Sequence, residues 1–170
     1  MRKLSLLATS LLLLFTLTTA SAQEAMQPLD DSQFYVGASL GVAFLRISEP
    51  SLGATGFDIK GHFGLKRFIG DSIDLRGSVG LVIGDVDLFT IAADAIYNLP
   101  LDDSFTAYGG AGLRLSFNDA NTFGVGLLAG ADYDLGSFTL FGELRTDVLL
   151  ASDGLSTFAP GIGIGVKFDF

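Results

Sequence analysis

Residues 34–44, which read Phe-Tyr-Val-Gly-Ala-Ser-Leu-Gly-Val-Ala-Phe, decide the fold. Apolar side chains occupy every second position from Phe34 to Phe44, and tyrosine, glycine, serine and alanine fill the positions between them. A repeat of two residues indicates a β-strand whose two faces differ in chemistry. An amphipathic helix would need apolar residues three and four positions apart, so this stretch does not fit a helix.

The same alternation recurs along the rest of the chain, and residues typical of turns separate the runs. The eight runs are 34–44, 57–66, 73–83, 89–97, 105–117, 123–134, 138–148 and 158–170. About twelve residues at about 3.3 Å each, tilted by about 40°, rise roughly 30 Å, the thickness of a bilayer core. The sequence therefore predicts an all-β, eight-stranded antiparallel up-and-down transmembrane β-barrel over residues 33–170.

Side-chain volume decides which face of this barrel points outward. The interior of an eight-stranded barrel barely holds its own side chains, so the large apolar face cannot lie inside. The opposite face suits a narrow lumen because it is rich in small residues, including glycines 37, 41, 64, 80, 110, 112, 124, 126, 130, 161, 163 and 165. This arrangement favours a membrane barrel over a soluble barrel that buries its apolar face.

Aromatic residues concentrate at the ends of the runs. Threading the runs as a meander puts Phe34, Tyr97, Phe105, Tyr133, Phe138, Phe168 and Phe170 at one rim, and Phe44, Phe57, Phe89, Phe117, Phe123 and Phe158 at the other. Two aromatic belts around an aliphatic band are typical of outer-membrane barrels.

Composition excludes several classes of function. The chain has 170 residues and no cysteine, which rules out disulfide scaffolds, cysteine-ligated metals and thiol chemistry. The net charge of −9 argues against a nucleic-acid partner, because phosphate binding needs a basic surface. The mean hydropathy of +0.50 is high for so acidic a chain and points to a lipid environment. We expect outer-membrane lipids as partners and a monomer.

The first 22 residues have the layout of a secretory signal peptide. Arg2 and Lys3 precede an apolar run, and Ala20-Ser21-Ala22 supplies the small residues of a cleavage site. A retained membrane anchor is disfavoured because Gln23-Glu24 follows in place of basic residues. We therefore predict a signal peptide at 1–22, export from the cytoplasm, and a flexible periplasmic lead-in at 23–32.

The last strand carries the most specific motif, Gly163-Ile-Gly-Val-Lys-Phe-Asp-Phe170. With this ending, the mature chain resembles the small eight-stranded outer-membrane β-barrels, such as the transmembrane domain of outer-membrane protein A and outer-membrane protein X. The resemblance implies location in the cell outer membrane. It also implies that Gly165, Phe168 and Phe170 form an assembly signal read by the barrel-assembly machinery.

Charges of both signs lie on the face of small residues. They are expected to pair across a narrow lumen, because an unpaired buried charge is costly. The candidate network consists of Lys60, His62, Asp94, Arg114, Glu143, Arg145 and Asp147. We expect Glu143 and Arg145 to pair with Lys60 and Arg114, or with Asp94.

Three functions remain open at this point. An ion-paired plug would suit a non-enzymatic protein with a structural, envelope-integrity role, and the small bore of eight strands favours it. A narrow pore for small ions is the first alternative. A lipid-modifying enzyme is the second, but the only histidine, His62, has no serine or threonine two residues away, as a His-x-Ser motif requires. The sequence therefore predicts no catalytic, cofactor-binding or metal site.

Overall fold

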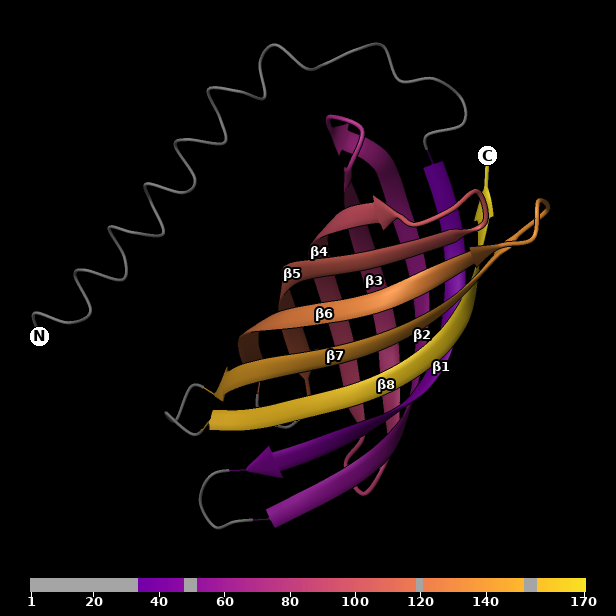
Figure 1. The fold of residues 1–170 in the computed structure, drawn as a ribbon. Helices are drawn as coiled ribbons and strands as arrows, with labels where there is room; N and C mark the ends of the chain where they lie inside the picture. Colours follow the sequence, from indigo (N-terminus) through magenta and orange to yellow (C-terminus); the bar gives the residue numbers. More distant parts are fainter. Residues whose placement is uncertain (1–33, 48–51, 119–120, 152–155) are drawn as a thin grey trace, which may run out of the picture. The chain divides into compact units, whose positions relative to one another are not determined.

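The computed structural model describes residues 34–47, 52–118, 121–151 and 156–170 (Figure 1). These residues form eight β-strands, which confirms the predicted number and class of elements. The strands are β1 (Phe34–Ile47), β2 (Leu52–Ile69), β3 (Ile73–Gly84), β4 (Leu88–Pro100), β5 (Phe105–Phe117), β6 (Thr122–Asp134), β7 (Thr139–Ala151) and β8 (Ser156–Asp169).

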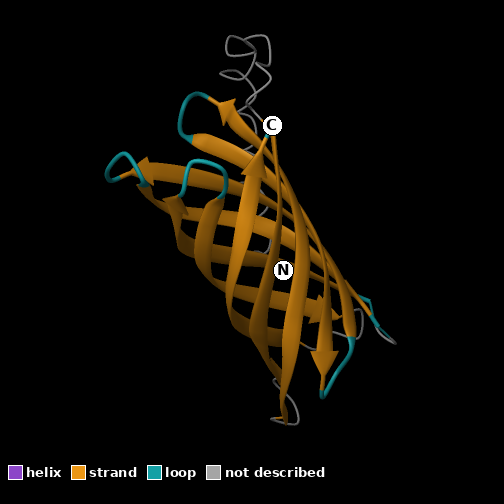
Figure 2. Ribbon diagram, turned by 90° about the vertical axis from the view of Figure 1, so that its right-hand side faces the viewer, coloured by secondary structure: helices purple, strands orange, loops and turns teal. Residues whose placement is uncertain are grey.

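The sheet is a closed up-and-down barrel. Each strand pairs antiparallel with the next one, and β8 pairs antiparallel with β1. The strands are inclined to the barrel axis, as closure of a twisted sheet requires (Figure 2). The start of β1 and the end of β8 lie at the end of the barrel that also carries turns 70–72, 101–104 and 135–138; we call it the turn end. The opposite end, where β1 connects to β2, is the loop end.

Side chains alternate between the lipid-facing wall and the lumen along every strand. The neighbouring residues Leu127 and Leu128 show this directly, since Leu127 is 64% exposed and Leu128 is 5% exposed. Phe57 and Ile164 are also largely exposed, although both are strongly apolar. Such a surface is stable in lipid and would be unfavourable in water. The described residues contain no helix long and apolar enough to cross a membrane.

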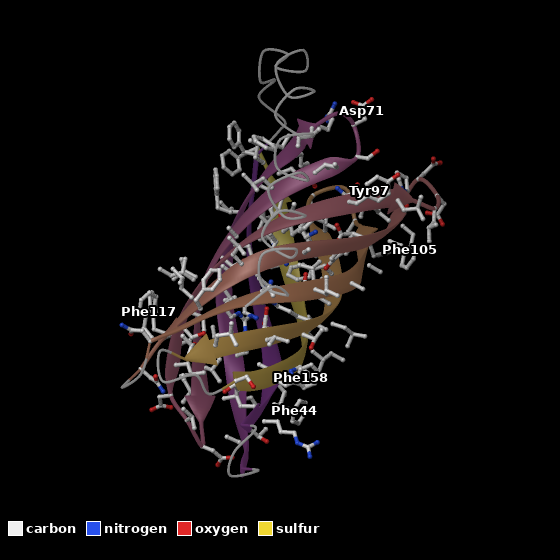
Figure 3. The ribbon with its side chains drawn as sticks, turned by 90° about the vertical axis from the view of Figure 1, so that its left-hand side faces the viewer. Phe44, Asp71, Tyr97, Phe105, Phe117 and Phe158 are labelled. Atoms are coloured by element: carbon white, nitrogen blue, oxygen red, sulfur yellow. The ribbon has the colours of Figure 1, made fainter. Side chains whose placement is uncertain are left out.

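The two aromatic rims form as predicted. Figure 3 shows Tyr97 and Phe105 near one end of the barrel, and Phe44, Phe117 and Phe158 near the other. Neighbouring strands bring the rings into contact. Phe89 and Phe117 have ring centroids 5.9 Å apart at the loop end, and Phe138 and Phe168 have centroids 6.1 Å apart at the turn end.

The strands are longer than the apolar runs. β2 continues past the expected end at residue 66 to Ile69, through a bulge at which Arg67 has a φ of 53°. The Asp74 carboxylate accepts a hydrogen bond of 2.9 Å from the Arg67 backbone N–H and holds this conformation. At the loop end, β1 and β2 pair as far as Ile47 and Leu52. Both strands of this hairpin therefore extend beyond the apolar runs 34–44 and 57–66, because backbone pairing continues beyond the lipid-facing alternation. The predicted signal peptide and lead-in lie outside the described residues.

A charge on the wall should be tolerated only where the wall leaves the lipid. Leu127 lies in the middle of β6, so we expect Leu127→Lys to lower the free energy of unfolding in phospholipid vesicles by about 2–4 kcal/mol. The matched control is Leu135→Lys, in the exposed turn after β6, for which a loss below about 1 kcal/mol is expected. Equal effects at both positions, measured by denaturant titration, would contradict a lipid-facing wall.

Candidate functional site

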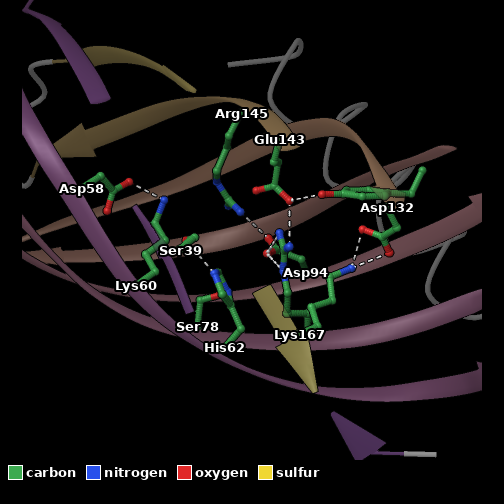
Figure 4. Close-up of polar contacts among 12 residues, drawn as sticks. Ser39, Asp58, Lys60, His62, Ser78, Asp94, Asp132, Glu143, Arg145 and Lys167 are labelled. Atoms are coloured by element: carbon green, nitrogen blue, oxygen red, sulfur yellow. Dashed lines mark hydrogen bonds and ion pairs between the residues drawn. The ribbon is translucent and has the colours of Figure 1, made fainter. Parts of the chain in front are cut away.

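An alternating series of charged side chains crosses the lumen. It begins with Glu143 of β7, whose Oε2 lies 2.7 Å from Nη1 of Arg76 on β3. Arg76 is the cross-strand neighbour of Asp94 on β4, and its Nη2 lies 3.1 Å from the Asp94 carboxylate. The second oxygen of Asp94 accepts a hydrogen bond of 2.7 Å from Arg145 Nη1, which returns the series to β7. Figure 4 shows these contacts in the lumen.

The series continues from Arg145 to Asp147 and Arg114. Arg145 Nε donates to Asp147 Oδ1 at 2.9 Å, and Arg114 Nη1 lies 2.8 Å from Asp147 Oδ2. Asp94 and Asp147 are each shared by two guanidinium groups, and neither has any exposed surface. We call Glu143, Arg76, Asp94, Arg145, Asp147 and Arg114 the lumen ion chain. It contains three positive and three negative groups, so the buried charge cancels within the chain.

Two glycines make room for the shared carboxylates. A Cβ at Gly112 would lie 2.9 Å from the Asp94 Cα and closer still to its carboxylate. A Cβ at Gly126 would lie 2.9 Å from the Asp147 carboxyl carbon. These two glycines of the lumen face therefore leave the volume that the shared carboxylates fill.

Lys60 pairs with Asp58, two residues earlier on the same strand. The side chains of both residues are mostly buried. This pair is neutral, like the lumen ion chain beside it.

Lys167 of β8 is held by a carboxylate and three aromatic rings near the turn end. Its Nζ donates to both oxygens of Asp132, at 2.8 and 2.6 Å. The same Nζ lies 5.4, 5.0 and 5.1 Å from the ring centroids of Tyr35, Tyr108 and Phe141. An ammonium group among ring faces gains cation–π attraction in addition to its ion pair. The Tyr108 hydroxyl also donates to Glu143 Oε2 at 3.2 Å, which connects this cluster to the lumen ion chain.

His62 lies between two serines and does not join an ion pair among the described residues. Its Nε2 is 2.8 Å from Ser39 Oγ, and its Nδ1 is 2.9 Å from Ser78 Oγ. Both ring nitrogens thus have hydroxyl partners, and the edge of the ring packs against Phe141. A hydrolase-type histidine needs a carboxylate or similar group to orient it, and serines occupy both positions here. The side chain is buried in the lumen, away from the bilayer edge.

The structure unites five of the seven residues in the candidate network. Asp94, Arg114, Glu143, Arg145 and Asp147 belong to one connected set, whereas Lys60 and His62 have partners of their own. Arg145 pairs with Asp94, which was among the expected partners, and also with Asp147, which was not. The expected pairing of Glu143 with Lys60 or Arg114 was wrong, because Arg76 lies directly across the lumen from it.

Sequence reasoning missed several partners of these residues. Arg76 was not part of the candidate network, and Asp58, Ser39 and Ser78 were not considered as partners. The strand register could have identified two of these partners, Arg76 and Ser78. Arg76 is paired with Asp94, and Ser78 with His62, on neighbouring strands. The contacts across the lumen have no such signal.

Apolar side chains occupy the lumen on both sides of the charges. Leu45, Leu149 and Ala159 form a buried cluster near the loop ends of β1, β7 and β8, with Ala54, Val86 and Leu88 packed against it. Toward the turn end, Ile96, Tyr108 and Leu128 form a second cluster. The described residues contain no group of His, Cys, Asp and Glu that could hold a metal ion.

The residues of the expected assembly signal lie along the closing seam. Phe168 and Phe170 point outward and are 47% and 59% exposed. The Phe170 N–H donates to the Phe34 carbonyl at 3.0 Å, and their rings stack with centroids 6.3 Å apart. Gly165 faces the lumen, where a Cβ would lie 2.6 Å from the Phe141 ring.

Solved structures of other proteins share this architecture. No family model and no curated protein matches the chain. Neisserial surface protein A superimposes with a TM-score of 0.71 and 20% identity over 81% of this chain and 97% of its own. A protein from the de novo design of transmembrane β-barrels gives 0.59 and 13%, over 83% and 98%. The N-terminal barrel domain of Pseudomonas aeruginosa OprF gives 0.50 and 20%, over 79% and 97%.

The chain has the fold of the small eight-stranded outer-membrane β-barrels. The closed antiparallel sheet, the apolar wall and the two aromatic rims define this class. At these levels of identity the likeness concerns the fold alone.

Removing one charge from the lumen ion chain should be far more costly than removing one at the rim. Asp94→Asn leaves two arginines without a shared buried carboxylate, and we expect a loss of about 3–5 kcal/mol in the free energy of unfolding. The control is Asp169→Asn, which breaks an exposed pair with Lys66 and should cost less than about 1 kcal/mol. Denaturant titration in vesicles measures both free energies of unfolding. A loss for Asp94→Asn as small as that for Asp169→Asn would contradict the prediction.

Proposed function

We propose that this protein is an integral outer-membrane barrel with a structural, non-enzymatic role in envelope integrity, and that its lumen is an ion-paired plug. The observation that carries the proposal is the lumen ion chain, whose six charges compensate one another in the middle of the barrel. Its partners would be the surrounding lipids and, during assembly, the barrel-assembly machinery, with the finished barrel as a monomer.

The chemistry of the wall supports the location. Exposed side chains such as Leu40, Val79, Leu127 and Ile164 cover a continuous band between the aromatic rims. A closed sheet leaves no unpaired strand edge, so backbone groups need no water within the bilayer. The fold is also the one found in the outer-membrane barrels described above.

The filling of the lumen supports a plug over a pore. The shared carboxylates are fully buried, and the cluster of Leu45, Leu149 and Ala159 lies between them and the loop end. An ion that crossed the barrel would have to displace both an apolar layer and a set of buried ion pairs. The environment of His62 gives no support to the alternative of a lipid-modifying enzyme, because the ring is enclosed by Ser39, Ser78 and Phe141. An unchanged lipid profile after deletion of the gene is the corresponding expectation.

A closed barrel should resist unfolding by detergent at room temperature. We expect the membrane-extracted protein to migrate at different positions in sodium dodecyl sulfate gels before and after boiling, because the unboiled barrel stays compact. A protein found wholly in the soluble fraction, with no shift in mobility, would refute the membrane barrel.

Conductance distinguishes a plug from an ion pathway. Glu143 is the terminal member of the lumen ion chain, and Glu143→Ala removes one partner of Arg76 while Asp94 still holds it. For a plug, planar bilayers should show no discrete current steps with either the unmodified protein or the variant. Steps that appear or grow in Glu143→Ala would instead support a gated pore for small ions.

A further inference from the structure

A small cavity lies within the lumen beside the seam between β1 and β8. Its volume is about 30 Å³. Its lining includes Gly41, Gly161 and Gly163, which have no side chains to fill it, and charged residues such as Asp58 and Arg114. The cavity therefore lies between the glycine-rich lumen faces of β1 and β8 and the charged side chains of the lumen.

Three buried polar atoms of residues that line this cavity have no hydrogen-bond partner among the described residues. They are Asp58 Oδ1, Arg114 Nε and Arg145 Nη2. All three residues are more than nine-tenths buried, and all three line the cavity. Buried polar groups in folded proteins are almost always paired, either with protein atoms or with ordered water. One acceptor and two donors match the capacity of a water molecule, which both donates and accepts.

The charge of the lining favours a neutral occupant over an ion. Lys60, Arg114 and Arg145 supply three positive charges, and Asp58, Glu143 and Asp147 supply three negative ones. A halide or a metal cation would add an uncompensated charge to a buried and already neutral set. The volume suits roughly one or two water molecules.

The backbone ladder beside the cavity is interrupted. Pairing of β1 with β8 runs from Tyr35 to Ala43 and resumes at Arg46, so Phe44 and Leu45 are skipped. Pro160, which lines the cavity, lies opposite the skipped residues and has no N–H to donate. Water next to such a break can accept and donate where the ladder does not.

We propose that this cavity is a structural hydration site, in which ordered water bridges Asp58 Oδ1 to Arg114 Nε and Arg145 Nη2. Ser39 also lines the cavity, so the water would link the Ser39–His62–Ser78 series to the ion pairs. The Leu45, Leu149 and Ala159 cluster lies on the loop side, and Phe141 lines the cavity itself. Exchange of this water with bulk solvent is therefore slow.

The test is nuclear magnetic resonance of the full-length barrel in detergent micelles, with measurement of cross-relaxation between water and protein protons. We expect cross-peaks from water to Arg114 Hε, with the sign of a residence time longer than about a nanosecond. Protons of Leu128, in the apolar cluster with Ile96 and Tyr108, should show no such peaks. Absence of the Arg114 cross-peak would overturn the proposal.

Two further measurements locate and identify the occupant. In Gly163→Ala, the new methyl group enters the cavity wall, 3.3 Å from the Leu40 carbonyl oxygen, and the cross-peak should be lost. Gly142→Ala is the matched control, because its methyl group meets nothing within 4 Å, and the cross-peak should remain. Persistence of the peak in Gly163→Ala would overturn the assignment to this cavity. Crystals of the unmodified protein grown in bromide give a result that does not depend on any variant. An anomalous peak at the site would show that a halide occupies the cavity and would overturn the assignment to water.

Discussion

Charge compensation inside a narrow barrel is the constraint on which the rest of this structure depends. Eight strands enclose too little space for hydrated ions, so each inward-pointing charge needs a partner on another inward-pointing side chain. The lumen ion chain meets this need with two fully buried aspartates, each shared by two arginines. Because the chain joins β3, β4, β5 and β7, it also fixes these strands relative to one another through contacts that the backbone ladder cannot supply.

The two faces of the wall follow from the same constraint. Large side chains that do not fit inside point into lipid, where Leu127 and Ile164 are favourable, and glycines such as Gly112 and Gly126 leave the inner volume to the charged groups. High hydropathy and strong acidity therefore coexist without conflict. The apolar residues define the outer surface, and the buried charges cancel in pairs. Much of the remaining acidity lies in turns, where Asp102 and Asp134 accept hydrogen bonds from backbone N–H groups.

The closing seam between β1 and β8 differs along its length. Near the turn end it is tied by the Phe34–Phe170 contact and by Lys167, which reaches Asp132 and three rings. Nearer the loop end the ladder skips Phe44 and Leu45 opposite Pro160, and the lumen cavity lies beside this break. The motif at 163–170 therefore belongs to the tightly held part of the seam.

The sequence by itself determined the number of strands, their order, the direction of each face and the two aromatic rims. It did so because alternation with a period of two is a local property, and lumen volume leaves one solution for where the large side chains go. Only the tertiary structure decided the partners across the lumen, such as Arg76 for Glu143 and Arg114 for Asp147. Those pairs depend on the stagger of the closed sheet and on side-chain length, so residues 67 positions apart in the chain meet, and no local pattern specifies which ones.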